Sequence, residues 1–504
     1  MKLVKSLILG SAAGLIAMGG AQAADLPVKA KAVEYVKICS LYGAGFYYIP
    51  GTDTCIKLGG YLRADVTVNG AAIYDDPSWG GGPGGAAAEN NRARFSLAAR
   101  SREDINIDTR TATEYGVVRT FFDATFNWTG TGGDPIAGSD VGVYYAFVQF
   151  AGFTIGKAIS QFDTPWTGYP GNQSSFLIGT TDDVTGINQI AYTAQFGNGV
   201  SGTVSMEDPT LYDQTQIVNT GTMAAAAQPG ILGGLPTSVA AVANGSPTAN
   251  GYGGFYMPDF VGMVRVDQAW GLFQASVAVH DVRGMYYGTF ETTGHPDDTY
   301  GWAGQLALSI KNITTGPGDT INVTGGYANG ASRYIIGGVS PNGYSLLQSG
   351  PTSGGTLAFA TSTDGVFGPG GSIQKTTAYG IQGAYTHNWD PHWATALFGS
   401  WAGERYNATA TGLYCAGIAA SFGAGNGLTT CNPNFNLSQI GSYTSWTPVK
   451  NLTFSVEAMY SQISQKMAGT LTSTAALGLI PAGSTYTMGN IGTVSGLFRV
   501  QRVF

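Results

Sequence analysis

The sequence is poor in charge for its length. Only 11% of its 504 residues are Asp, Glu, Lys or Arg, whereas about a quarter is usual for soluble proteins. Glycine, in contrast, contributes 76 residues, and aromatic side chains make up 12%. The mean hydropathy is close to zero. This combination excludes a bundle of membrane helices and fits strands whose outer face needs no charge.

The sequence also lacks long apolar runs beyond its N-terminus. After the N-terminal region, no segment contains about 20 consecutive apolar residues, so membrane-spanning helices are not expected. At the N-terminus, a basic start and a mostly apolar stretch over residues 7–18 precede AQA at 21–23, which has the form of a cleavage site. We therefore expect residues 1–23 to be a secretory signal peptide and residues 24–504 to be the mature chain.

Histidine is scarce, and the residues that catalysis would need are not grouped. The four histidines are His280, His295, His387 and His392. The sequence contains no Gly-x-Ser-x-Gly elbow in a strand–helix context and no cluster with metal-ligand spacing. An enzyme is therefore a remote alternative. We expect no cofactor, no metal and no nucleic-acid partner.

Cysteine is rare as well. The four cysteines, Cys39, Cys55, Cys415 and Cys431, form two pairs, each separated by 16 positions. A secreted chain enters an oxidising compartment, where disulfides persist. We predict one bridge within each pair, which would stabilise the fold by roughly 3 kcal/mol in the chain-entropy model. A metal site and free thiols are the weaker alternatives.

Residues 55–69, CIKLGGYLRADVTVN, alternate between two kinds of side chain. The even positions from Ile56 to Val68 are apolar or small, and the odd positions from Lys57 to Asn69 carry the charges. A period of two indicates an extended strand with two unlike faces. In a soluble sandwich the apolar face forms the core. In a membrane barrel the apolar face meets lipid and the polar face lines a channel.

The connections between such segments alternate in length. Short turns rich in Gly, Asn, Asp and Pro occur at 151–152, 197–199, 270–271, 315–319, 389–392 and 447–451. Long connections occur near 70–90, 161–186, 208–258, 331–373 and 403–435. Counting the segments between them gives about 16 strands. Long loops at one end, short turns at the other and an even count predict an all-β, antiparallel transmembrane β-barrel with short periplasmic turns and long extracellular loops.

If the apolar faces meet lipid, basic residues line the lumen. At about 3.3 Å per residue, four cations are expected near one level of the wall: Arg63, Arg94, Arg119 and Lys157. Two more, Arg92 and Arg100, extend this stripe. The candidate acids opposite are Asp163, Asp182 and Asp183, if the connection 161–186 folds inward. Such a transverse field would tune ion preference. The alternative is that Arg63, Arg94 and Arg119 only tie neighbouring strands together through Asp65 and Asp123.

Several segments resemble the alphaproteobacterial (Rhizobiales-type) general porins of the outer membrane. EYVKICSLYGAGFYYIPGTDTCIKLGGYLR (34–63) is similar to the N-terminal region of that family. VQFAGFTIGKAISQFDTPW (148–166) resembles the strand that enters the family's constriction loop. NQIAYTAQFGNG (188–199) and the terminal RVQRVF (499–504) are also similar.

This resemblance implies a homotrimer of 16-stranded barrels in the bacterial outer membrane, in contact with lipid and lipopolysaccharide. It implies passive diffusion of small hydrophilic solutes and ions through a water-filled pore. It also implies that residues 161–186 fold into the pore as the constriction loop, and that residues 24–55 form a periplasmic segment with a disulfide hairpin. The loops 208–258 and 331–373 depart from the family because they are unusually long and rich in Gly and Ala.

Other classes of protein remain open at this point. A substrate-specific outer-membrane channel has the same sequence pattern, because selectivity depends on how the loops are placed. A secreted all-β binding protein, such as an adhesin or a lectin, would turn the apolar faces inward instead. The orientation of the two faces separates the barrel from the secreted protein.

Overall fold

The computed structural model describes residues 37–69, 97–129, 140–166, 168–174, 177–180, 186–209, 215–221, 251–254, 256–336, 343–349, 355–422, 427–472 and 483–504. The predicted signal peptide (1–23), Arg92, Arg94, Asp182 and Asp183 lie outside these residues.

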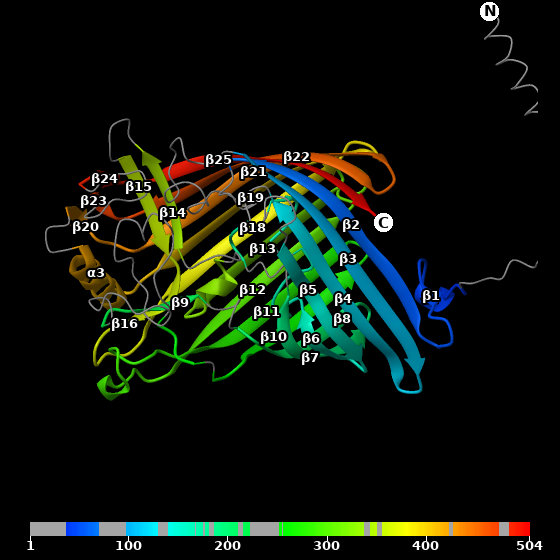
Figure 1. Ribbon diagram of the computed structural model, residues 1–504, viewed down its shortest axis with the longest axis horizontal. Coiled ribbons are helices and arrows are strands. Elements are labelled where there is room, and N and C mark those ends of the chain that lie inside the picture. Colours follow the sequence, from blue (N-terminus) through cyan, green and yellow to red (C-terminus); the bar gives the residue numbers. More distant parts are fainter. Residues whose placement is uncertain are drawn as a thin grey trace, which may run out of the picture.

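In the part of the chain that the structure describes, sixteen antiparallel strands form a closed barrel (Figure 1). The wall strands are β2 (Cys55–Val68), β3 (Leu97–Thr113), β4 (Gly116–Thr129), β5 (Asp140–Phe150), β6 (Phe153–Ala158), β7 (Ile187–Gly197), β8 (Val200–Glu207), β10 (Asp259–Gln268), β11 (Gly271–Val282), β12 (Thr299–Lys311), β13 (Thr320–Asn329), β18 (Thr377–Asn388), β19 (Trp393–Arg405), β21 (Phe435–Val449), β22 (Leu452–Gln465) and β25 (Ile491–Val503). Pairing of β25 with β2 closes the wall.

The two faces of the wall have the orientation expected of a membrane barrel. In β2, Leu58 and Leu62 are 53% and 56% exposed, whereas Asp65 and Thr67 on the opposite face are 2% exposed. The same division recurs around the wall, where exposed Val, Leu, Ile and Phe alternate with buried polar side chains. The apolar faces therefore point outward and the polar faces inward. This orientation confirms the predicted fold and excludes the secreted sandwich, in which the apolar faces would be buried.

Short turns join the strands at one end of the barrel. Two-residue connections follow β3, β5, β7, β10 and β21. Four non-glycine residues in the short connections, Ala151, Asn198, Asn312 and Asn451, have positive φ, the conformation that tight hairpins require and that Asn tolerates best. The C-terminal Phe504 ends beside Gly60, whose carbonyl accepts its backbone N–H.

The other end of the barrel carries additional structure (Figure 1). A five-stranded sheet contains β14 (Gly343–Ser349), β15 (Gly355–Thr361), β24 (Thr485–Met488), β23 (Ala468–Thr472) and β20 (Leu428–Thr430), and a three-stranded sheet contains β17 (Gln374–Lys375), β16 (Thr363–Phe367) and β9 (Gln216–Asn219). Among the described residues, the helical elements are α3 (Ala408–Phe422) and three 3₁₀ turns, η2 (Glu291–Thr293), η3 (Ser332–Tyr334) and, near the N-terminus, η1 (Ser40–Tyr42). No helix among the described residues has the length and apolar character needed to cross a membrane.

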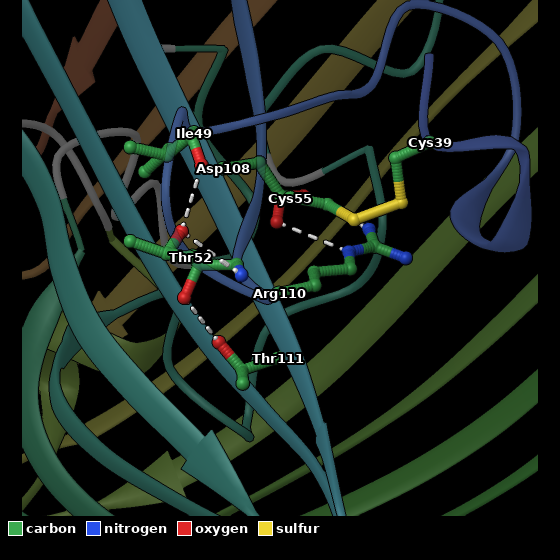
Figure 2. The surroundings of a disulfide bond; sticks show 8 residues. Cys39, Ile49, Thr52, Cys55, Asp108, Arg110 and Thr111 are labelled. Atoms are coloured by element: carbon green, nitrogen blue, oxygen red, sulfur yellow. Dashed lines mark hydrogen bonds and ion pairs between the residues drawn. A yellow bond between two sulfur atoms is a disulfide. The ribbon is translucent and has the colours of Figure 1, made fainter. Parts of the chain in front are cut away.

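Both predicted disulfides are present. Cys415 in α3 is bonded to Cys431, and Cys39 is bonded to Cys55 at the start of β2. The short β1 (Tyr47–Tyr48) pairs with β2 next to the first bridge. Figure 2 shows this bridge beside Arg110, which binds the Asp108 carboxylate through Nη2 at 2.9 Å. The N-terminal hairpin is thereby fixed against the periplasmic end of the wall.

An apolar core fills part of the barrel interior. Val261, Ala278, Ala303, Ala328 and Ala378 are direct cross-strand neighbours on β10 to β18, and all are at most 3% exposed. Their small inward side chains leave room for the end of η3, where Tyr334, Ile335 and Ile336 pack against this row. The interior on the β10–β18 side is therefore occupied by packed side chains.

A buried polar cluster fixes this insertion to the wall. His280 of β11 lies between Asp259 of β10 (Nδ1 to Oδ1, 2.7 Å) and the Tyr252 hydroxyl (2.9 Å from Nε2). The Tyr252 hydroxyl donates to Asp364 of β16 at 2.8 Å. Burial, followed by the neighbouring Asp364 carboxylate, raises the pKa of Tyr252, so this phenol stays protonated and keeps donating. Asp364 in turn accepts the backbone N–H of Ser332 at 2.6 Å.

Candidate pore constriction

Charged side chains are concentrated on the inner face of neighbouring wall strands. On β25, β2, β3 and β4, the inward-facing charged residues that the structure describes are Arg499, Lys57, Arg63, Asp65, Arg100, Arg102, Asp104, Asp108, Arg110, Arg119 and Asp123. Strand periodicity explains this, since every second residue of a strand shares a face. The charged arc lies on the strands that close the barrel, β25 and β2, and on the neighbouring β3 and β4, whereas the apolar row lies on β10–β18.

Asp65 organises the middle of this arc. Arg100 binds Asp65 from β3 through Nε at 3.0 Å, and Arg499 binds it from β25 through Nε at 2.6 Å. The Asp65 and Arg100 side chains are each 1% exposed, and that of Arg499 is 8% exposed. One carboxylate thus holds two buried guanidinium groups and joins three strands across the closure of the barrel.

Arg63 has a different environment. Its Nε donates to Gln501 Oε1 at 3.0 Å, and its guanidinium lies 4.5 Å from the centre of the Tyr61 ring. Among the described residues it forms no ion pair. Its direct cross-strand neighbour is Arg102 of β3. Arg63 faces the lumen, as predicted. It is not paired with Asp65, as it would be if it only tied neighbouring strands together.

The structure corrects the expectation that Arg63 and Arg119 lie at one level. Arg119 of β4 is the cross-strand neighbour of Arg110 of β3, and Arg110 is the neighbour of Cys55 of β2. Cys55 lies eight residues along β2 from Arg63. That offset corresponds to about 26 Å along the strand. A hairpin turn at residues 114–115 causes the difference, because it places Arg119 close to the periplasmic end of β4. There Arg119 pairs with Asp108 at 2.9 Å and not with Asp123.

The structure also corrects the lumenal position predicted for Lys157. Lys157 shares a face of β6 with Phe153 and Ile155, which are 45% and 51% exposed. Its ammonium donates to the Val143 carbonyl at 2.6 Å. The inward positions of β6 are instead those of Thr154 and Ala158. Lys157 therefore lies on the outer surface of the barrel wall.

The described residues of the connection 161–186 contact inward-facing side chains on the opposite wall. The Phe162 ring packs on Tyr334, with 4.6 Å between ring centres. Asp163, a predicted acid, is 6% exposed, and its carbonyl accepts from Gln274 of β11 at 2.7 Å. Trp166 Nε1 donates to Thr324 of β13 at 2.9 Å. The segment thus follows the inner wall from β11 to β13.

Gln173 and Ser174, which we call the loop tip, reach the charged arc. The backbone N–H groups of Gln173 and Ser174 donate to Glu457 of β22 at 2.6 and 3.2 Å. The Gln173 carbonyl accepts from Arg499 Nη1 at 3.2 Å. Arg499 also binds Asp65, so the loop tip joins the network at the middle of the arc. Neither Glu457 nor Arg499 was predicted from the sequence as a site residue, although a period of two puts Glu457 on the same face of β22 as Ser455 and Ser461.

A closed barrel with an apolar exterior and a charged interior defines an outer-membrane channel protein. A family model described as "Porin subfamily" matches residues 25–480. Porin Omp2b of Brucella canis is 32% identical over 336 residues, covering 60% of this chain and 79% of the relative. Porin Omp2b of Brucella suis is 33% identical over 340 residues with the same coverage. The chain belongs to this porin family, as the resemblance implied, and is a porin of the bacterial outer membrane.

A solved structure shows the same fold at lower sequence similarity. The outer membrane channel DcaP of Acinetobacter baumannii matches with a TM-score of 0.57 and 14% identity, covering 91% of this chain and 99% of that chain. At this identity the match supports the barrel architecture only.

Proposed function

We propose that solutes and ions diffuse passively along the charged arc formed by β25, β2, β3 and β4. This proposal rests on the difference between two parts of the inner wall of the barrel. On β10 to β18 the inner wall is covered by the packed apolar row and by the described part of the connection 161–186, whereas the arc presents charged side chains. Ions require water or fixed charges along their path. We assign the chain no enzymatic activity.

The narrowest part of this path is proposed to lie between the loop tip and the middle of the arc. Its bases are Arg63, Arg100, Arg102 and Arg499, with Arg94 as a further candidate. Asp163, Asp182 and Asp183 remain candidate acids, although the Asp163 segment lies against β11 and not at the arc. The contacts of Gln173 with Glu457 and Arg499 support this location.

Neutralising Arg63 is expected to shift ion selectivity toward cations. A unit charge in water changes the energy of an ion about 8 Å away by ~0.5 kcal/mol, with opposite sign for anions and cations. Arg63→Gln should therefore change the chloride-to-sodium permeability ratio by about fivefold. Reversal potentials in planar bilayers under a salt gradient measure this ratio. Arg283→Gln, at the exposed extracellular end, is the control. An unchanged ratio for Arg63→Gln would exclude Arg63 from the constriction.

We further propose that three copies of the chain associate through the outer face of β25, β2 and β3. Glu103 points outward there, between Leu62 of β2 and Phe126 of β4. Its carboxylate has no hydrogen-bond or ion-pair partner among the described residues. Arg502 lies on the same row, on the other side of Leu62. Charge on a lipid-facing wall is destabilising. In a closed ring of three copies this face would contact the neighbouring copy, and the charged side chains would not face lipid. The remaining apolar surface is proposed to contact lipid and lipopolysaccharide.

Replacing Glu103 by leucine separates the two possible environments of this carboxylate. At a subunit interface, Glu103→Leu removes a charged hydrogen-bonding group worth about 1.5–3 kcal/mol. The variant should therefore dissociate to monomers at a lower temperature on gels run after graded heating. On a lipid-facing wall, the same change should leave dissociation unchanged or raise barrel stability. A wild-type protein that is monomeric in mild detergent would contradict the trimer itself.

A further inference from the structure

Aromatic side chains form a continuous row on the inner wall next to the charged arc. Tyr144 and Tyr145 of β5 have ring centres 6.5 Å apart, and Tyr145 lies 6.2 Å from Phe121 of β4. Phe121 in turn lies 5.4 Å from Phe147. The Arg102 guanidinium is 5.6 Å from the Tyr144 ring. The row therefore runs from the middle of the arc toward the periplasmic end of the barrel.

The row ends at a hollow of about 260 Å³ in the inner wall. Its lining includes the aromatic Phe121, Tyr145 and Phe147 and the polar Gln149, Thr154 and Gln161. Drug-sized molecules occupy pockets of about 300–1,000 Å³, and a dry cavity of about 150 Å³ holds benzene. The hollow therefore matches one six-membered ring with its substituents.

The charge at this hollow is largely compensated. Arg119 lines it, and its guanidinium binds the Asp108 carboxylate at 2.9 Å and donates to Gln149 Oε1 at 2.9 Å. Phe121 and Phe147 lie 5.0 and 5.6 Å from the same guanidinium. An anionic solute would compete with Asp108 for Arg119, so the site favours a neutral solute.

Apart from Arg119, the polar side chains that line the hollow are two amides and a hydroxyl. Gln149 Nε2 donates one hydrogen to Thr154 Oγ1 at 3.0 Å, and a side-chain amide carries two. Gln161 Nε2 donates to Gln189 Oε1 at 2.8 Å, which fixes the orientation of the amide. Such groups recognise hydroxyls by donating and accepting hydrogen bonds. The aromatic rings in the lining carry negative π density on their faces, which attracts the weakly positive C–H groups of a saturated ring.

We infer that this hollow is a binding subsite for a neutral pyranose ring, so that the pore binds sugars transiently as they diffuse through it. The inference rests on the proposed channel function. The C–H face of the ring packs on Phe121 and Phe147, and its hydroxyls face Gln149, Thr154 and Gln161. A plain aromatic solute would pack on the rings but would not use the remaining hydrogen-bonding capacity of these polar groups.

Current through single wild-type channels in planar bilayers tests the inference. Methyl β-glucopyranoside added to the solution should reduce the current in a saturable manner. Sorbitol, an acyclic polyol of similar size, should change it only through bulk conductivity and viscosity. In the Phe121→Leu/Phe147→Leu double variant, the half-blocking glucoside concentration should rise roughly tenfold, because two ring contacts are lost. Phe153→Leu, on the outer face, is the matched control and should behave like the wild type.

Block by the other solutes and in the double variant distinguishes the pyranose subsite from its alternatives. If sorbitol or the neutral aromatic benzamide blocks as strongly as the glucoside, the pyranose assignment is wrong. If the double variant binds the glucoside as tightly as the wild type, the hollow is not the site. An unchanged salt conductance in the double variant shows that the barrel has folded. If the wild-type protein conducts no ions, the proposed function fails, whereas normal conductance without glucoside block overturns the subsite alone.

Discussion

Replacing Asp65 by asparagine is expected to destabilise the barrel by about 3–5 kcal/mol, because one partner of a buried ion pair is removed. Asn has nearly the same shape but no charge, so Arg100 and Arg499 would stay buried without their shared carboxylate. These arginines come from β3 and β25, on either side of β2. The substitution therefore weakens the wall at the point where the barrel closes. Urea unfolding in detergent, followed by tryptophan fluorescence, measures the change in free energy.

Asp267→Asn provides the matched control for this prediction. Asp267 pairs with Arg265 at 2.7 Å, but the two side chains are 49% and 32% exposed. Exposed ion pairs contribute about 0–1 kcal/mol, so this variant should unfold close to the wild-type urea concentration. Equal losses of stability in the two variants would show that burial of the Asp65 network has no special role.

The wall of the barrel was predictable because its pattern is local. In β2, a period of two assigns each residue to a face, and the outward face of a membrane barrel is the apolar one. The same rule placed Arg63 and Arg100 in the lumen. Applied consistently, it also places Lys157 outward, since Lys157 has the parity of Phe153 and Ile155. The sequence therefore contained the information needed to place Lys157 correctly.

The height of residues in the lumen was less predictable, because it depends on register. The turn at residues 114–115 lacks Pro and Asn, and Gly116 follows as its main signal. Without that turn, Arg119 is placed at mid-strand and Asp123 becomes its expected partner. The observed register puts Asp108 within reach of both Arg110 and Arg119. Which side chains pair across two strands depends on the register between those strands, and the sequence of one strand alone does not determine that register.

The packed core inside the barrel was not predicted. Each alanine of the row on β10–β18 is an ordinary strand residue by itself, and only the closed sheet brings them side by side. The segment that covers them comes from the connection 331–373, which the sequence marked only as long and rich in Gly and Ala. Its attachment through His280, Asp259 and Asp364 joins residues up to 105 positions apart, beyond the reach of any local pattern.

Replacing Glu457 by leucine is expected to release the loop tip from the wall. The substitution leaves the N–H groups of Gln173 and Ser174 without their carboxylate acceptor, and an unsatisfied buried donor costs about 1–3 kcal/mol. Arg499 and Ser455 still contact Gln173, so the loop tip should open only part of the time. A loss of about 1–3 kcal/mol raises the population of opened loop tips by roughly 5- to 150-fold.

Single-channel recordings detect this opening as added current fluctuations and a larger mean conductance in Glu457→Leu, because a tip that leaves the wall changes the width of the path beside Arg499. Glu291→Leu, which removes an exposed carboxylate in η2, controls for the loss of charge and should give wild-type records. A disulfide engineered between the loop tip and β22 in the Glu457→Leu background should restore steady current. Wild-type conductance and noise in Glu457→Leu would show that the tip does not border the conducting path, and the constriction would then have to be sought away from the middle of the arc.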